Sequence, residues 1–160
     1  MSQIPPGGRK QLRWSRHDYA APATYLITLC IPDREPALGR IHQGKVVPSD
    51  LGQIVRDEWL ALSSALEEVD VDEFVVMPDH LHGIVKMLRL PAGASSTRSK
   101  SLWAVMQRFK SITTRRINLL RSTPGESFWQ RSYHDRIIRD PAYLIRARNY
   151  IRCNPSRWGP

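Results

Sequence analysis

The chain has 160 residues, of which 41% are hydrophobic and 24% are charged. This length fits one compact domain, and the composition is typical of a globular protein rather than a disordered or fibrous one. No apolar run approaches the roughly 20 residues that a membrane-spanning helix needs, and residues 1–9 lack the apolar stretch of a secretory signal, so we expect a cytoplasmic protein.

The net charge of +9 at pH 7 is unevenly distributed along the chain. Residues 98–160 contain fourteen Lys and Arg against three Asp and Glu, whereas residues 21–97 contain six against eleven. This excess favours a polyanionic partner, because cationic side chains neutralise phosphates and release counterions. The alternative is a basic surface that only keeps the protein soluble. Cys30 and Cys153 fit neither a disulfide framework nor a zinc-site spacing, so we expect two reduced thiols.

The first third of the chain predicts an arm, a strand and a small hairpin. Residues 1–22 are polar, basic and interrupted by Pro and Gly, which is typical of a flexible arm. Residues 23–31 (ATYLITLCI) are β-branched and aromatic, as in a buried central strand. Residues 41–47 predict a hairpin with Gly44 in its turn.

The middle of the chain predicts one helix followed by two strands. Ser49 or Asp50 is suited to cap a helix whose apolar residues recur at three- and four-residue spacing. These are Leu51, Ile54, Val55, Trp59, Leu62 and Leu66. Residues 73–77 and 80–88 predict strands of an antiparallel hairpin, separated by a break at Pro78 and Asp79. Residues 91–99 (PAGASSTRS) predict a flexible loop.

The last third predicts a second amphipathic helix from Leu102 to about Leu120, a loop at 122–126 and a strand over 128–139. Asp140 then caps a short helix over 141–154 that has a proline in its first position. The order β, α, β, β, α, β, α predicts an α+β fold, the ferredoxin-like split βαβ sandwich. Its four-stranded antiparallel sheet carries both long helices on one face, and the last helix is an addition.

His80 and His82 form the first candidate for chemistry. Residues two apart on a strand project to the same face, so both imidazoles can bind one metal ion while Leu81 packs behind them. Histidines on strands are common and often have no catalytic role, which is the alternative interpretation.

Tyr150 and Asn154 form the second candidate, because residues at i and i+4 share one face of a helix. Two imidazoles and an amide oxygen leave open positions on a divalent ion, Mg²⁺ or Mn²⁺ rather than a closed zinc site, that can polarise a phosphate. A phenol is a weak nucleophile that such polarisation assists. A phosphotyrosine intermediate would permit strand joining without ATP. The alternative is a tyrosine that only packs.

Four segments of the chain carry a family resemblance. They are VVMPDHLHGIV (75–85), FKSITTRRIN (109–118), FWQRSYHDRIIRD (128–140) and NYIRCNPSRWG (149–159). Together and in this order they resemble the REP-associated tyrosine transposases, domesticated relatives of the single-tyrosine, His-hydrophobic-His transposases of small insertion sequences. The resemblance runs from about residue 13 to the C-terminus, so that a catalytic domain is expected over residues 23–160 after the arm at 1–22.

The resemblance implies a function and roles for particular residues. Family members cut single-stranded DNA beside short hairpins and leave a 5′-phosphotyrosine and a free 3′-hydroxyl. By motif position, His80 and His82 correspond to the metal-binding pair, Tyr150 to the nucleophile and Asn154 to the third metal ligand. Relatives are monomers or homodimers, and both states remain open here.

Basic and aromatic residues are suited to contact such a substrate. Cations can follow phosphates and aromatic rings can stack on unpaired bases. The candidates are Arg108, Lys110, Arg115, Arg116, Arg131, Arg136 and Arg139 for phosphates, Trp129 and Tyr133 for stacking, and Arg9, Lys10, Arg13 and Arg16 in the arm. The alternative for each is a solvated charge or a core aromatic.

Two other functions are compatible with the sequence. A nucleic-acid-binding module without catalytic activity could use the same sheet, as single-strand RNA binders do. A metal-dependent nuclease could instead use activated water and form no covalent intermediate, in which case Tyr150 would be dispensable.

Overall fold

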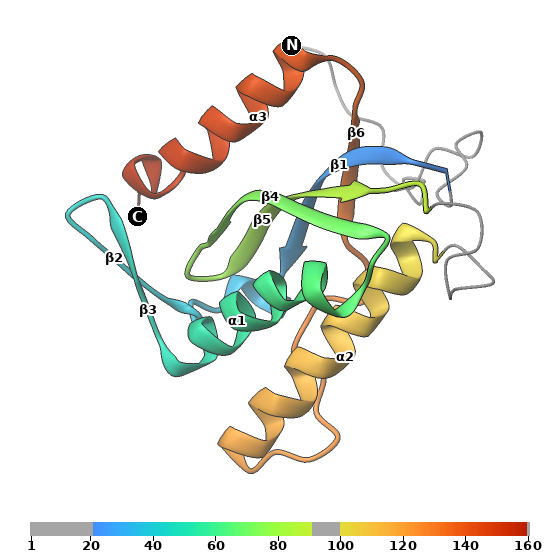
Figure 1. Cartoon of the computed structure of the whole chain (residues 1–160). Coiled ribbons are helices and arrows are strands. Elements are labelled where there is room, and N and C mark those ends of the chain that lie inside the picture. The colour runs from blue at the N-terminus through green and yellow to red at the C-terminus, as the bar shows by residue number, and fades with distance from the viewer. Residues whose placement is uncertain (1–20, 91–99, 160) are drawn as a thin grey trace, which may run out of the picture.

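The computed structural model describes residues 21–90 and 100–159 (Figure 1). Most of the predicted arm, with Arg9, Lys10, Arg13 and Arg16, lies outside the described residues, as does the predicted loop at 91–99. The strands are β1 (Ala23–Cys30), β2 (Gly39–His42), β3 (Lys45–Pro48), β4 (Val69–Val76), β5 (His80–Met87) and β6 (His134–Ile138). The α-helices are α1 (Asp50–Ala65), α2 (Leu102–Arg121) and α3 (Pro141–Cys153), and two 3₁₀ turns are η1 (Pro32–Arg34) and η2 (Pro155–Arg157).

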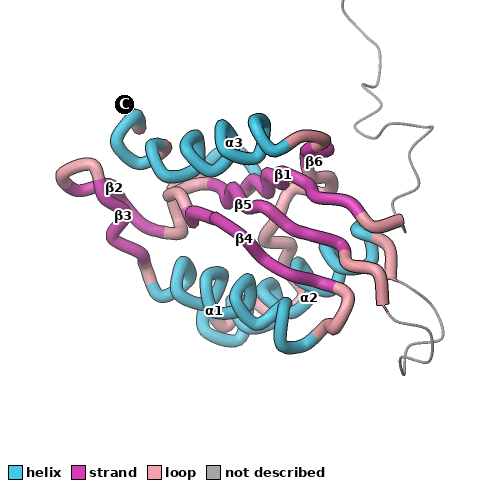
Figure 2. The backbone as a smooth tube through the Cα atoms, turned by 45° about the horizontal axis from the view of Figure 1, so that its top comes forward, coloured by secondary structure: helices cyan, strands magenta, loops and turns pink. Residues whose placement is uncertain are grey.

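The main sheet has the strand order β4-β5-β1-β6, and neighbouring strands run antiparallel. Figure 2 shows α1 and α2 on one face of this sheet and α3 on the other. The predicted ferredoxin-like sandwich is therefore confirmed, with α3 as the addition to it. β2 and β3 form the predicted separate hairpin, and Gly44 has the positive φ of 71° that its turn requires.

Local sequence explains where the helices begin. The side-chain oxygens of Ser49, Ser101 and Asp140 each accept a hydrogen bond from a backbone amide in the first turn of α1, α2 and α3. Such caps satisfy amides that have no partner inside the helix. Pro141 occupies the first turn of α3, where its missing N–H costs little.

The two faces of the sheet are packed very differently. Between the sheet and the α1–α2 layer lies a large core that includes the fully buried Tyr25, Trp59 and Phe109. Between the sheet and α3 lies a small cluster of four buried residues, Ile84, Ile138, Ala147 and Ile151. Much of the face under α3 is therefore available for polar side chains.

Two predicted boundaries were wrong. The strand predicted over 128–139 is only His134–Ile138, because Phe128 and Trp129 belong to a buried loop. The Trp129 indole N–H donates to Thr113 Oγ1 at 2.8 Å, so packing on α2 holds this aromatic segment. The strand predicted from Glu73 already begins at Val69 and contains a bulge. No helix in the described part of the chain is long and apolar enough to cross a membrane.

Candidate active site

The two histidines lie at the start of β5, on the face of the sheet that α3 covers. Leu81 and Gly83 alternate with them and face the large core, where the closest neighbour of Gly83 is Trp59. The ring centroids of His80 and His82 are 4.5 Å apart, and both residues are buried. The structure thus brings the two imidazoles together on one face, as the sequence predicted.

Each imidazole is held through its Nδ1 atom. His82 pairs with Thr28 across β1 and β5, and the Thr28 hydroxyl lies 2.8 Å from His82 Nδ1. The buried carboxylate of Asp79 contacts His80 Nδ1. Because a carboxylate only accepts, Nδ1 of His80 is the protonated nitrogen and Nε2 carries its lone pair. The same tautomer of His82 allows its Nδ1–H to donate to Thr28.

Arg34 supports Asp79 from the turn after β1. Its guanidinium lies 2.7 Å from Asp79 Oδ2 and donates to the Cys30 sulfur at 3.1 Å. Asp33 and Arg34 both have positive φ, 55° and 56°, which is uncommon for residues with a side chain. Backbone conformations of this kind persist where the surrounding structure fixes them. Burial raises the pKa of the Cys30 thiol, which keeps it protonated.

Burial keeps both histidines neutral at physiological pH. Burial lowers the pKa of His80, an effect that the Asp79 carboxylate only partly opposes. Burial is also the main reason that the pKa of His82 is lowered, to about 3, and the neighbouring His80 ring and the Arg34 guanidinium lower it further. A neutral imidazole is the form that binds a metal ion.

Tyr150 reaches this site from α3. Its phenol oxygen lies 3.3 Å from His82 Nε2, and the two ring centroids are 5.2 Å apart. Tyr150 is 43% exposed, so a substrate can approach the phenol. Tyrosine and histidine come from the same chain, and the pairing requires no second copy of the protein.

A cavity of about 550 Å³ opens beside the phenol. His82 and Tyr150 line one end, and Arg136 of β6 and Arg146 of α3 are among the other lining residues. Tyr143 also lines the cavity, and its buried hydroxyl has no hydrogen-bond partner within residues 21–90 and 100–159. A cavity with two guanidinium groups and a free phenol is suited to an anionic, hydrogen-bonding ligand.

The imidazole pair fits a divalent ion. Metal-binding histidines usually donate their second ring N–H to a carboxylate or another oxygen, as His80 does to Asp79. Across the described residues, no group of three or more His, Cys, Asp and Glu could hold a metal. Further ligands would therefore be an amide, water or substrate. Asn154 directly follows α3 as its C-cap, four residues beyond Tyr150, and its role as third ligand stays a prediction.

The predicted DNA contacts fall into different environments. Trp129 and Tyr133 are only 5% and 3% exposed, so neither ring offers a stacking surface here and both belong to the core. Lys110 donates to the backbone carbonyls of Gln130 and Arg131 and thereby fixes that loop. Arg116 pairs with Glu58 of α1 at 2.6 Å.

The remaining predicted cations are exposed and lie on different elements: Arg108 and Arg115 on α2, Arg131 in the loop before β6, Arg136 on β6, and Arg139 directly after β6. Of these, Arg136 lines the cavity beside Tyr150. The structure therefore brings His80, His82 and Tyr150 together but distributes the predicted phosphate contacts over more than one surface.

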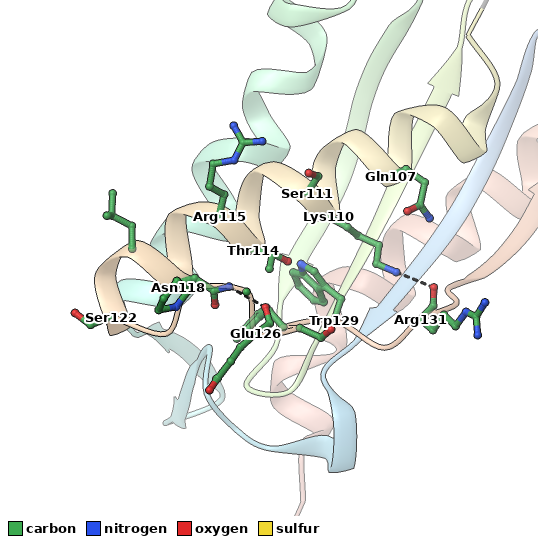
Figure 3. Close-up of a pocket in the computed structure, with 15 residues that line it drawn as sticks. Gln107, Lys110, Ser111, Thr114, Arg115, Asn118, Ser122, Glu126, Trp129 and Arg131 are labelled. Atoms are coloured by element: carbon green, nitrogen blue, oxygen red, sulfur yellow. Dashed lines mark hydrogen bonds between the residues drawn. The ribbon is translucent and has the colours of Figure 1, made fainter.

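A larger groove of about 1140 Å³ lies away from this site, between α2 and the segment that follows it (Figure 3). Arg115 and Arg131 are among its lining residues, together with Asn118 and Glu126. Figure 3 shows the Lys110 side chain bonded to the Arg131 backbone at one end of the groove. The groove contains neither the imidazoles nor the phenol, so its size does not make it the site of chemistry.

Sequence reasoning missed several residues of the site. Asp79 directly precedes His80, and this adjacency was the available signal. No pattern in the sequence pointed to Thr28, because Thr28 meets His82 only through the strand register of β1 and β5. Nor did any pattern point to Arg146, which lines the cavity only because of how α3 lies over the sheet. The ring centroid of Trp158 lies 5.9 Å from that of His80. This proximity depends on how the chain folds back after α3, so the sequence alone did not predict it.

Comparison with known proteins agrees with this fold. Residues 53–154 match the model of a protein family described as IS200-like transposase. The match spans more than half of the chain, so this protein belongs to the IS200-like transposase family, a class of DNA-processing enzymes. An uncharacterized protein from Haemophilus influenzae is 29% identical over 94% of this chain and 89% of its own length.

Two solved structures share the fold. One is a REP-associated tyrosine transposase bound to a REP hairpin, with a TM-score of 0.63, 19% identity, and coverage of 91% of this chain and 73% of that one. The other is a putative transposase from Deinococcus radiodurans R1, with a TM-score of 0.52, 14% identity, and coverage of 82% and 89%. The resemblance inferred from the sequence is thereby confirmed in family and fold.

Proposed function

We propose that this protein is a metal-dependent endonuclease and strand transferase that acts on single-stranded DNA next to a hairpin. The observation that carries the proposal is the 3.3 Å separation of the Tyr150 phenol oxygen and His82 Nε2. A nucleophile and a metal-binding nitrogen are then adjacent in one site. Membership in a transposase family supports DNA as the substrate. The similar structure of a REP-associated tyrosine transposase bound to a REP hairpin supports a substrate that contains a hairpin.

In the proposed reaction the Tyr150 oxygen attacks a backbone phosphorus. A bond forms between the phenol oxygen and phosphorus, the bond from phosphorus to O3′ breaks, and the phenol proton is lost while O3′ gains one. The products are a 5′-phosphotyrosine and a free 3′-hydroxyl. Because the phosphodiester energy is conserved, attack by another 3′-hydroxyl rejoins the strand and releases Tyr150.

His80 and His82 would hold the divalent ion, Mg²⁺ or Mn²⁺, with Asn154 as the proposed third protein ligand. A bound ion would supply Lewis acidity to the phosphate. Thr28 and Asp79 orient the imidazoles so that their Nε2 lone pairs are available. Arg136 and Arg146 face the same cavity and would neutralise phosphate charge. A DNA substrate of this kind is consistent with action in the cytoplasm.

The proposal is tested with a labelled single-stranded hairpin oligonucleotide and Mg²⁺ or Mn²⁺. We expect a protein–DNA species on a denaturing gel that is absent with Tyr150→Phe, His80→Ala or a metal chelator. Binding without this species in the unmodified protein would support a binding module instead. Cleavage by Tyr150→Phe would support a nuclease that uses activated water.

A further inference from the structure

The helix that carries Tyr150 has little apolar support. Four buried residues lie between α3 and the sheet, whereas α1 and α2 cover a much larger core. Ile145 on α3 is 57% exposed, so part of its apolar surface is not buried at all. Since the phenol must lie within a few ångströms of a reacting phosphate, other contacts must fix the position of α3.

Two ion pairs supply such contacts with the edge strand β4. Arg148 donates to both carboxylate oxygens of Asp72, at 2.8 and 2.6 Å. Arg152 contacts Glu73 Oε2 at 2.9 and 2.7 Å. Arg148 and Arg152 are one helical turn apart, so they follow one edge of α3, and Tyr150 lies between them in the chain.

A β-bulge explains how two consecutive acids reach the same helix. Val71 pairs with Val85 and Phe74 with Gly83, so both Asp72 and Glu73 lie opposite the single residue Ile84. In a regular strand, consecutive side chains point to opposite faces of the sheet. The extra residue of the bulge breaks this alternation, and both carboxylates contact α3.

The first of these pairs is the better shielded. The Asp72 side chain is 10% exposed and also lies 2.8 Å from Lys86 Nζ. The Arg148 hydrogen bonds are the main reason that the pKa of Asp72 is far below its usual range. The Glu73 side chain is 29% exposed and its partner Arg152 is 59% exposed, so water screens that pair more strongly.

We propose that the two bulge carboxylates, Asp72 and Glu73, are positioning residues that hold α3 so that Tyr150 faces His82. They touch neither the phenol nor the imidazole and act through the backbone of α3. The inference rests on the proposed function only where it treats Tyr150 as the nucleophile. The mechanical part, that these carboxylates fix the helix, holds for the protein without DNA or metal.

The test neutralises the acids and keeps both arginines, so that no candidate phosphate contact is lost. The variants are Asp72→Asn, Glu73→Gln and the double change. The matched control is Glu58→Gln, which breaks the Arg116–Glu58 pair between α2 and α1. The first readout is amide hydrogen exchange of α3 without DNA or metal. The second is the mobility of a spin label on Cys153, an exposed thiol at the end of α3.

We expect the double variant to exchange its α3 amides about tenfold faster or more, with α1 and α2 unchanged. In the hairpin cleavage assay we expect kcat to fall roughly ten- to a hundredfold with little change in KM. One further variant exchanges the second pair, Glu73→Arg with Arg152→Glu, and so replaces an arginine as well. Its α3 exchange and kcat should lie closer to those of the unmodified protein than the values of Glu73→Gln alone do. Glu58→Gln should change neither.

Three outcomes would overturn the proposal. They are unchanged exchange and label mobility in α3, an equal increase of exchange in α1 and α2, or a loosened α3 with unchanged kcat. If the unmodified protein forms no DNA adduct at all, the proposed function fails, yet the exchange and spin-label results still decide whether the carboxylates hold the helix.

Discussion

The phenol oxygen of Tyr150 lies 3.3 Å from Nε2 of His82, although the two residues are 68 positions apart in the chain. The contact exists because β5 presents its histidines to the sheet face that α3 crosses (Figure 2). One chain therefore supplies both the proposed nucleophile and the proposed metal-binding nitrogen.

Replacing Thr28 by Val should weaken metal binding without removing a ligand. The change deletes the oxygen that fixes His82 Nδ1, and loss of such a supporting group typically lowers metal affinity by about ten- to a hundredfold. Titration calorimetry with Mn²⁺ in the absence of DNA measures this affinity.

Thr24→Val is the matched control, because Thr24 lies on the same strand opposite Lys86 rather than opposite a histidine. It should bind Mn²⁺ as the unmodified protein does. Nitrogen NMR of the His82 ring should also show a mixture of tautomers in Thr28→Val alone. Equal Mn²⁺ affinity in both variants would refute the supporting role of Thr28.

The stability of the metal-free protein should rise with pH between about 3 and 6.5. The folded state holds His82 with a pKa of about 3, whereas an unfolded histidine titrates near its ordinary value of about 6.5. In this window the unfolded state binds more protons, so the free energy of unfolding increases by up to about 1.4 kcal/mol per pH unit for each such group.

Chemical denaturation at several pH values measures this slope. His82→Gln should flatten it between pH 4.5 and 6.5, a range chosen to lie above the ordinary Asp and Glu values. His80 contributes in the same direction, because burial lowers its pKa as well. A slope that is identical in the two proteins would show that His82 is not held neutral.

Gly83→Ala should destabilise the fold. A Cβ at this position would lie 2.3 Å from the Trp59 ring, which is fully buried and packs edge-on against Phe109. Overpacking of this kind costs about 1–3 kcal/mol in the free energy of unfolding, measured by urea denaturation. The double variant Gly83→Ala with Trp59→Phe should recover part of the loss, because the smaller ring leaves room; an additive loss would argue against the clash.

Arg136→Ala and Arg146→Ala should each weaken binding of single-stranded DNA. Both residues line the cavity beside Tyr150, and loss of one phosphate contact should reduce the slope of log affinity against log salt by about one. Fluorescence anisotropy at several salt concentrations measures this slope. Arg56→Ala, an exposed cation on α1, is the control and should leave it unchanged. Equal effects of all three variants would indicate only nonspecific attraction.

Much of the fold could be predicted because local sequence and tertiary packing agree. The caps at Ser49 and Asp140, the apolar spacing of α1 and the alternation around His80 and His82 each specify an element and its face. The strand predicted at 128–139 was too long, because aromatic residues favour strands while Trp129 is instead held in a loop by its bond to Thr113.

The histidine pair could be predicted from spacing, whereas its partners could not. Thr28 contacts His82 through the register of β1 and β5, and Arg148 contacts Asp72 through a bulge. Register shifts and bulges depend on packing of the whole sheet and leave no simple periodic signal in one sequence. The buried environment of Tyr133 also depends on tertiary packing, and its ring was wrongly assigned to a stacking surface.

Mass spectrometry of the trapped complex tests most directly whether Tyr150 becomes covalently joined to DNA, as proposed. Trypsin cleaves after Arg148 and Arg152, so Tyr150 is released in a peptide of residues 149–152. After nuclease digestion we predict that this peptide carries a 5′-linked nucleotide on Tyr150. Cleaved DNA with this peptide unmodified, or with the nucleotide on another residue such as Tyr143, would contradict the role of Tyr150 as nucleophile.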